Sequence, residues 1–152
     1  FARLKDVHTL NMTDCTQITE GAICLLTKLR TLNVSGCTQI TDNTFAHLNE
    51  IHTLDMSYCD EITDKAFAHL KGVHSLNMSY CTQITDDAFE HLTGVVDLVL
   101  DGCTQESLQT EKLLRHLKNV RCLCWCDTTM LKDFAPKLQR FVESNSIDFL
   151  KD

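Results

Sequence analysis

A cysteine returns every 22 residues, four times in succession, and this period constrains the fold more than any other feature of the sequence. The cysteines are Cys15, Cys37, Cys59, Cys81 and Cys103. The units around them share the frame Φ-x-x-L-x-x-Φ-x-x-L-x-Φ-x-x-C-x-x-I-T-D, where Φ is an apolar residue and x is any residue. One unit of this length cannot bury its apolar face alone, so successive units must stack on one another.

Each unit predicts one strand followed by one short helix or helical turn. Before the cysteine, alternation sends Leu54 and Met56 to one face, as in a strand. After the cysteine, the Ile-Thr-Asp segment is typical of a helix start. The candidate caps of these short helices are Thr41, Asp42, Thr63, Asp64, Thr85 and Asp86, and we expect the caps at Asp42, Asp64 and Asp86.

The period divides the chain into repeats at 1–22, 23–44, 45–66, 67–88, 89–113 and 114–128. Segment 129–152 is predicted to be a C-terminal cap with an apolar helical face, in which Ile147 and Phe149 supply one last short strand. The first unit opens at Phe1 without a polar cap. We therefore expect that part of the parent protein lies upstream, and that the uncapped N-terminal unit can mediate self-association.

The frame resembles the leucine-rich repeat, in its cysteine-containing class, over residues 1–128. The resemblance implies an α/β fold, a right-handed solenoid of about six parallel strands. Repeats of this class are best known from F-box/leucine-rich-repeat proteins, the substrate receptors of cullin-type ubiquitin ligases. The nearly identical Ile-Thr-Asp and Phe-x-His-Leu segments are similar to those of F-box/repeat proteins of large amoebal DNA viruses. The resemblance therefore implies substrate recognition within a ubiquitin-ligase receptor, although these 152 residues contain no F-box-like segment.

The outward residues of the strands are predicted to line a concave, partner-binding face. Tyr58 and Tyr80 stand out there, because tyrosine offers a large contact area at low entropic cost. An alternative interpretation is that the short polar side chains pair with one another across neighbouring strands. The predicted binding set is Thr31, Asn33, Thr53, Asp55, Ser57, Tyr58, Ser75, Asn77, Ser79, Tyr80, Asp97, Val99 and Asp101.

The five periodic cysteines are interpreted as a structural ladder of free thiols at the inner turn. Side chains in such a column run parallel, which suits neither disulfide pairing nor convergence on zinc. Free thiols in this number indicate a reducing, intracellular compartment, cytoplasm or nucleus.

A second set, Cys122, Cys124 and Cys126, admits four interpretations: a soft-metal site, a redox-sensitive patch, a partner contact or burial under the C-terminal segment. Alternate Cβ atoms of a strand lie about 6.5–7 Å apart, too far to chelate one ion easily. We therefore expect no metal and no cofactor.

Charge is unevenly distributed along the chain. The net charge is −7, which argues against a nucleic-acid partner. Residues 31–111 carry 2 lysines against 13 acidic residues, whereas residues 112–152 carry 8 basic and 5 acidic residues. No apolar run is long enough for a membrane span.

The sequence thus favours a non-catalytic protein-interaction module, because no nucleophile, base and oxyanion donor converge at a recognisable spacing. The alternatives are a self-assembling or structural scaffold and, more remotely, a thiol- or metal-binding protein.

Overall fold

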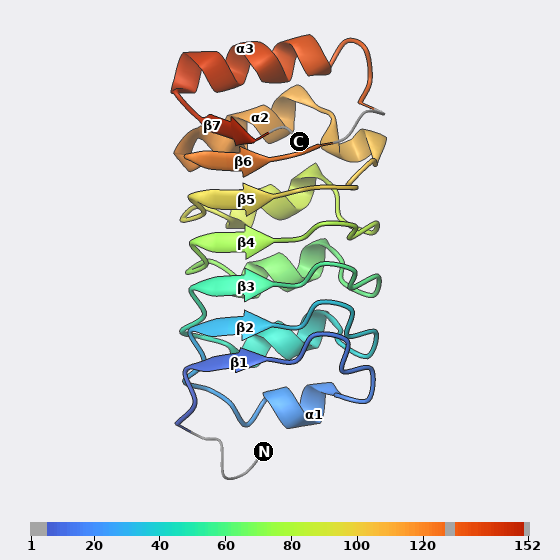
Figure 1. Cartoon of the computed structure of the whole chain (residues 1–152), viewed down its shortest axis with the longest axis vertical. Coiled ribbons are helices and arrows are strands. Elements are labelled where there is room, and N and C mark those ends of the chain that lie inside the picture. The colour runs from blue at the N-terminus through green and yellow to red at the C-terminus, as the bar shows by residue number, and fades with distance from the viewer. Residues whose placement is uncertain (1–5, 127–129, 151–152) are drawn as a thin grey trace.

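Seven short strands form one parallel sheet in the computed structural model, which describes residues 6–126 and 130–150. The strands follow one another in the order of the sequence and stack along the long axis of the molecule, with the helical segments behind them (Figure 1). The strands are β1 (Thr9–Asn11), β2 (Thr31–Asn33), β3 (Thr53–Asp55), β4 (Ser75–Asn77), β5 (Asp97–Val99), β6 (Cys122–Cys124) and β7 (Asp148–Leu150).

The register repeats the period of the sequence. Leu32 pairs with Leu54 and Leu54 with Leu76, while the longer step from β5 to β6 pairs Leu98 with Leu123. The predicted α/β solenoid is confirmed. Its seventh strand comes from the last segment, beside Ile147, so the sheet has one strand more than the six repeats supply.

Short helical segments return the chain from one strand to the next. Three of them are 3₁₀ helices of six residues, and this tight geometry places residues i and i+3 on the same side, as for the buried Phe45 and Leu48. The segments are α1 (Glu20–Ile23), η1 (Asp42–His47), η2 (Asp64–His69), η3 (Asp86–His91), η4 (Glu106–Leu108), α2 (Glu111–His116), η5 (Leu117–Asn119) and α3 (Ala135–Asn145). No helix in these described ranges is both long and apolar enough to cross a bilayer.

Helix α3 lies beyond β7 at the end of the solenoid (Figure 1). Its Leu138 and Val142 are buried, and Phe134 packs against Trp125 with ring centroids 5.6 Å apart. The helix ends at Ser146, which adopts a left-handed conformation. The division into repeats and a cap at residue 129 stays a prediction, since residues 127–129 lie outside the described part.

Each buried cysteine of the ladder donates its thiol to a backbone carbonyl of the preceding unit. Cys37 Sγ lies 3.0 Å from the Met12 carbonyl oxygen, and Cys81 Sγ lies 3.2 Å from that of Met56. Cys59 and Cys103 make equivalent bonds at 3.3 and 3.2 Å, whereas Cys15 in the first unit is exposed. Each buried thiol therefore has an acceptor, and most of these carbonyls also accept a backbone N–H, as the Met12 carbonyl does from Cys15 at 3.0 Å.

The aspartates of the Ile-Thr-Asp segments bind the next unit rather than capping their own helix. The preceding threonine occupies the N-cap position, and Asp64 accepts both the N–H and the hydroxyl of Thr85, at 2.7 and 2.6 Å. Asp42 binds Thr63 in the same way, and Asp86 accepts the hydroxyl of Thr110 at 2.6 Å. The predicted caps at these three aspartates are thus corrected, because stacking brings a better donor pair within reach.

Replacing a buried ladder cysteine should destabilise the solenoid. Cys81→Ala removes a buried sulfur and its hydrogen bond, so we expect a loss of about 1–2 kcal/mol in the free energy of unfolding. Cys15→Ala, at the exposed position of the same column, should change it by less than about 0.5 kcal/mol. Urea unfolding followed by circular dichroism measures both, and equal losses would contradict the ladder described above.

Stability should also fall in alkali. Burial, above all, raises the pKa of Cys59 and of Cys81 to about 12. The unfolded chain releases these protons near an ordinary value of about 8.5, so between these values the folded state binds more protons. The free energy of unfolding then decreases as the pH rises above about 9, by up to about 1.4 kcal/mol per pH unit for each thiol. A Cys59→Ala/Cys81→Ala variant should show a shallower decrease between pH 8 and 11, and the same decrease in both proteins would refute this assignment.

Candidate functional site

The outward residues of the strands form a polar surface, here called the strand face, on the side of the sheet opposite the helices. Many of them bond to one another. Asp55 Oδ1 accepts both the N–H and the hydroxyl of Ser57, at 3.0 and 2.6 Å, and Ser57 Oγ lies within hydrogen-bond distance of Ser35 Oγ, at 2.9 Å. Asn77 holds Ser79 similarly. The predicted pairing of short polar side chains is therefore present.

This pairing removes two residues from the predicted partner-binding set. The exposed fractions of Ser57 and Ser79 are 4% and 6%, so neither can contact a partner. The other members of the set are half-buried or exposed, and they lie on the strands or in the turns that follow them: Thr31, Asn33, Thr53, Asp55, Tyr58, Ser75, Asn77, Tyr80, Asp97, Val99 and Asp101. Their role in binding stays a prediction.

Tyr58 and Tyr80 form an exposed aromatic stack on the strand face. Their rings are 9° from parallel with centroids 4.5 Å apart, and the residues are 53% and 45% exposed. Partial desolvation, followed by the neighbouring Tyr80, raises the pKa of Tyr58 above that of an ordinary tyrosine. The pair presents a flat apolar surface with a polar edge.

Both tyrosines occupy a backbone conformation that favours glycine. Their φ angles are +59°, and the equivalent positions in neighbouring units are Gly36 and Gly102, at +69° and +67°. For Tyr80 the turn is closed by the Cys81 N–H, which donates to the Met78 carbonyl at 3.2 Å. A side chain in this left-handed region costs about 1–2 kcal/mol. Ring stacking, at about 0.5–1.5 kcal/mol, offsets only part of that cost.

Gly102 allows the Tyr80 ring to lie flat on the next turn. A Cβ atom at Gly102 would stand 2.3 Å from a carbon of that ring. In this column two adjacent tyrosines supply the rings, and the glycine that follows them leaves room for the ring of Tyr80. The signal was present in the sequence, because glycine and tyrosine share one column of the repeat.

A cluster of two cysteines and one aspartate lies next to the stack. Cys124 Sγ is 3.7 Å from Cys126 Sγ and 3.3 Å from Asp101 Oδ2. Burial first, then hydrogen bonds with Asp101 and Cys126, raise the pKa of Cys124 to about 12. Cys122 stands apart from this cluster, where burial and the charges of Asp97 and Asp148 raise its pKa.

The strand spacing predicts that the three cysteines do not converge, and Cys122 does lie apart, but Cys124 and Cys126 come together. The spacing applies to one strand through all three residues, whereas β6 ends at Cys124, and the chain beyond it brings the sulfur of Cys126 back toward that of Cys124. The three side chains are half-buried, so they are neither sealed by the C-terminal segment nor freely exposed.

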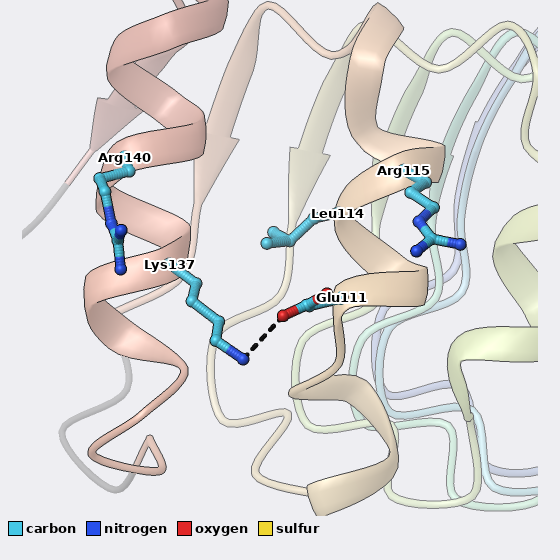
Figure 2. Close-up of a pocket in the computed structure, with 5 residues that line it drawn as sticks. All are labelled: Glu111, Leu114, Arg115, Lys137 and Arg140. Atoms are coloured by element: carbon cyan, nitrogen blue, oxygen red, sulfur yellow. Dashed lines mark hydrogen bonds and ion pairs between the residues drawn. The ribbon is translucent and has the colours of Figure 1, made fainter.

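A second surface is the groove between α2 and α3, shown in Figure 2. It encloses about 410 Å³ and is lined by Glu111, Leu114, Arg115, Lys137 and Arg140. Lys137 and Glu111 form an ion pair at 2.8 Å across the groove. Within the described ranges, the guanidinium groups of Arg115 and Arg140 form no ion pair, so this end of the molecule is basic.

Histidines also recur at the 22-residue period in two columns, but they do not converge on a site. His52 and His74 stack with ring centroids 4.6 Å apart, and both are exposed. His47, His69 and His91 end the three six-residue 3₁₀ helices. The cluster of Asp101, Cys124 and Cys126 is the only group of three or more potential metal ligands in the described part of the chain, and it includes no histidine.

Comparison with known proteins agrees with this geometry. The family model described as "Leucine Rich repeat" matches residues 25–43 and 47–66, which lie on two successive strand–helix units. These two units are leucine-rich repeats, and the chain has the fold of a leucine-rich-repeat solenoid. No curated protein matches it significantly.

Three solved structures resemble this leucine-rich-repeat solenoid. A chain of the yeast Rad7–Elc1 complex has a TM-score of 0.60 at 18% identity, over 82% of this chain and 38% of that one. A chain of the Drosophila Toll–Spatzle complex has 0.50 at 16%, over 74% and 18%. The tropomodulin C-terminal domain of Caenorhabditis elegans has 0.50 at 10%, over 93% and 85%. At these identities the likeness concerns the fold alone, and the chain spans well under half of the first two proteins.

Glycine should be tolerated better than alanine at the tyrosine positions of the solenoid. Tyr58→Gly removes the ring but also relieves the left-handed strain, so we expect the free energy of unfolding to change by less than about 1 kcal/mol. Tyr58→Ala keeps the strain, and it should be less stable than Tyr58→Gly by about 1 kcal/mol. Thermal and urea unfolding of the two variants measure the difference. The opposite order would show that the backbone at this turn is not strained.

Proposed function

We propose that this solenoid is a protein-interaction module whose strand face binds a protein partner around Tyr58 and Tyr80. The observation that carries the proposal is the exposed stack held at positions where glycine is the less strained residue. Stability of the fold does not require rings there, since Gly36 and Gly102 serve the same turn in neighbouring units. Exposed strain of this kind is typical of residues kept for binding.

The charge around the stack indicates the chemistry of the partner. Asp55, Asp97 and Asp101 lie on the strand face, in the acidic part of the chain. An arginine side chain would suit this surface, because its guanidinium stacks on tyrosine and pairs with carboxylates. We therefore expect the partner to present arginine beside an apolar group, and we expect neither nucleic acid nor a membrane surface.

The finer proposal is substrate recognition within an F-box-type ubiquitin-ligase receptor. Its support is the resemblance of the cysteine-containing frame to the repeats of such receptors. The free thiols of the described ladder agree with work in a reducing compartment, cytoplasm or nucleus. The F-box itself would lie elsewhere in the parent protein, and the sequence upstream of Phe1 tests this: an F-box there supports the ligase role, and an unrelated domain contradicts it.

Removal of the rings should abolish partner binding while leaving the fold intact. A Tyr58→Gly/Tyr80→Gly variant should raise the dissociation constant of the partner at least tenfold, because central aromatic residues dominate interface energies. The partner is first captured from cells with the wild-type protein, and its affinity for purified variants is then measured by fluorescence anisotropy.

The matched control is His52→Ala/His74→Ala, which deletes the other exposed aromatic stack of the molecule. This variant should bind the partner as the wild type does. If the histidine variant loses binding and the tyrosine variant retains it, the interface lies at the edge where the strands begin, and the proposal fails.

A scaffold role is a second candidate, favoured by the basic groove between α2 and α3. Arg115 and Arg140 of one copy could meet the acidic units of another. Such an assembly would weaken as salt screens the charges. Sedimentation velocity at low and high salt separates the two functions, since a monomer under both conditions excludes this contact. Self-association through the N-terminal unit stays a prediction, and it would persist at high salt if apolar residues such as the exposed Leu25 mediate it.

A further inference from the structure

The cluster of Asp101, Cys124 and Cys126 arises where the repeat breaks its own pattern. In the first four units, an Asn or Asp near the strand end accepts the N–H two residues later: Asn11, Asn33, Asp55 and Asn77. In the last two units, Val99 and Cys124 take that place and offer no such acceptor. The N–H of Cys126 is bound instead by Asp101 Oδ1 of the preceding unit, at 2.7 Å.

This change in the hydrogen-bond pattern holds the carboxylate of Asp101 beside the sulfurs of Cys124 and Cys126. Asp101 Oδ1 is held by the backbone, while Oδ2 lies 3.3 Å from Cys124 Sγ. Potential ligand atoms of all three residues lie within 4.8 Å of one another. A hydrogen bond that orients a ligating carboxylate is the kind of outer contact that metal sites use.

The distances match a tetrahedral ion. Zinc binds thiolate sulfur at about 2.3 Å, so two sulfurs on one tetrahedral ion stand about 3.8 Å apart. A sulfur and a carboxylate oxygen bound at about 2.1 Å stand about 3.6 Å apart. The observed separations are 3.7 Å between the sulfurs, and 3.5 and 3.3 Å from Cys124 Sγ to the two oxygens of Asp101. Two of the three ligand separations therefore already suit one ion, and the third, between Cys126 and Asp101, is at most 4.8 Å.

We propose that Asp101, Cys124 and Cys126 bind one Zn²⁺ ion, with water as the fourth ligand in the isolated chain. The side chains are half-buried, so the ion can enter from the strand face. On binding, each thiol releases its proton to solvent and a zinc–sulfur bond replaces the sulfur–hydrogen bond. Two sulfur ligands select zinc over Mg²⁺ and Ca²⁺, which prefer oxygen alone.

The site would join the last units of the solenoid. Asp101 follows β5, whereas Cys124 ends β6, and Cys126 Sγ also lies 3.5 Å from the carbonyl oxygen of Leu150 in β7. A bound ion would therefore link β5 to β6 at the end of the sheet that α3 covers. This role is separate from partner binding by the tyrosines, and it is measured without any partner.

Titration with Co²⁺ and Zn²⁺ tests the site in the purified, reduced chain. Cobalt in a tetrahedral thiolate site gives intense visible d–d bands and a sulfur-to-metal charge-transfer band in the near ultraviolet. We expect both signals to saturate at one Co²⁺ per chain and to disappear when Zn²⁺ is added. Mg²⁺ should leave them unchanged. Because Cys15 and Cys24 are accessible too, the titrations use a Cys15→Ala/Cys24→Ala background.

Variants of the three ligands assign the signal to the cluster. Cys124→Ser and Cys126→Ser should each lower the zinc affinity about 100-fold or more, beyond the roughly 10–100-fold that loss of an outer contact costs. Asp101→Asn keeps an oxygen that can accept the Cys126 N–H but loses the anionic ligand, so a loss of about 10–100-fold is expected. The control is Cys122→Ala on the same strand, which should bind as the background does.

Three results would overturn the proposal. The first is the absence of any cobalt spectrum in the fully reduced background protein. The second is an equal loss of affinity in Cys122→Ala and Cys124→Ser. The third is a mass decrease of two hydrogens on mild air oxidation that is confined to a peptide with Cys124 and Cys126, together with no zinc binding by the reduced form, which would make the pair a redox couple.

Discussion

Everything in this molecule depends on contacts between one unit and the next. A unit of 22 residues has one apolar side and no partner for it within itself. Stacking provides three kinds of bond at once: the parallel strand ladder, the thiol of one cysteine to the preceding unit, and the aspartate of one unit to the threonine of the next. Because these bonds recur through the central units, the stability of the solenoid is distributed along its axis rather than concentrated in a centre.

The parts of the fold that repeat could be predicted from the sequence. The period located the strands, and alternation placed Leu54 and Met56 in the core, where both are buried. Local rules failed where a neighbouring unit offered a stronger partner. Asp64 follows a threonine at a helix start, as a cap would, yet it binds Thr85 in the adjacent unit. Ser57 alternates outward, yet Asp55 and Ser35 hold its hydroxyl against the sheet. The sequence of a single unit does not show how close these side chains lie to partners in the neighbouring unit.

The candidate site could be predicted in part, for a related reason. The exposure of Tyr58 and Tyr80 follows from their column, and the glycines in that column already indicated a turn of unusual conformation. The period implies the spacing between units that the ring stack requires, but it does not give the orientation of the two rings. The cluster of Asp101, Cys124 and Cys126 could not be predicted, because its geometry depends on where β6 ends. The departures from the repeat at Val99 and Cys124 nevertheless mark its location in the sequence.

The identical joints between units have a consequence for how such a chain can change length. Asp42 holds Thr63, and Asp64 holds Thr85, with nearly the same pair of distances. If recombination within the gene removed codons 45–66, Thr85 would arrive where Thr63 had been, and Ser75 would pair where Thr53 had paired. The shortened product would keep the strand, thiol and aspartate joints and lose one copy of each, although the stack of Tyr58 on Tyr80 would disappear. For the fold, gain or loss of a whole unit is therefore a milder change than insertion of a single residue.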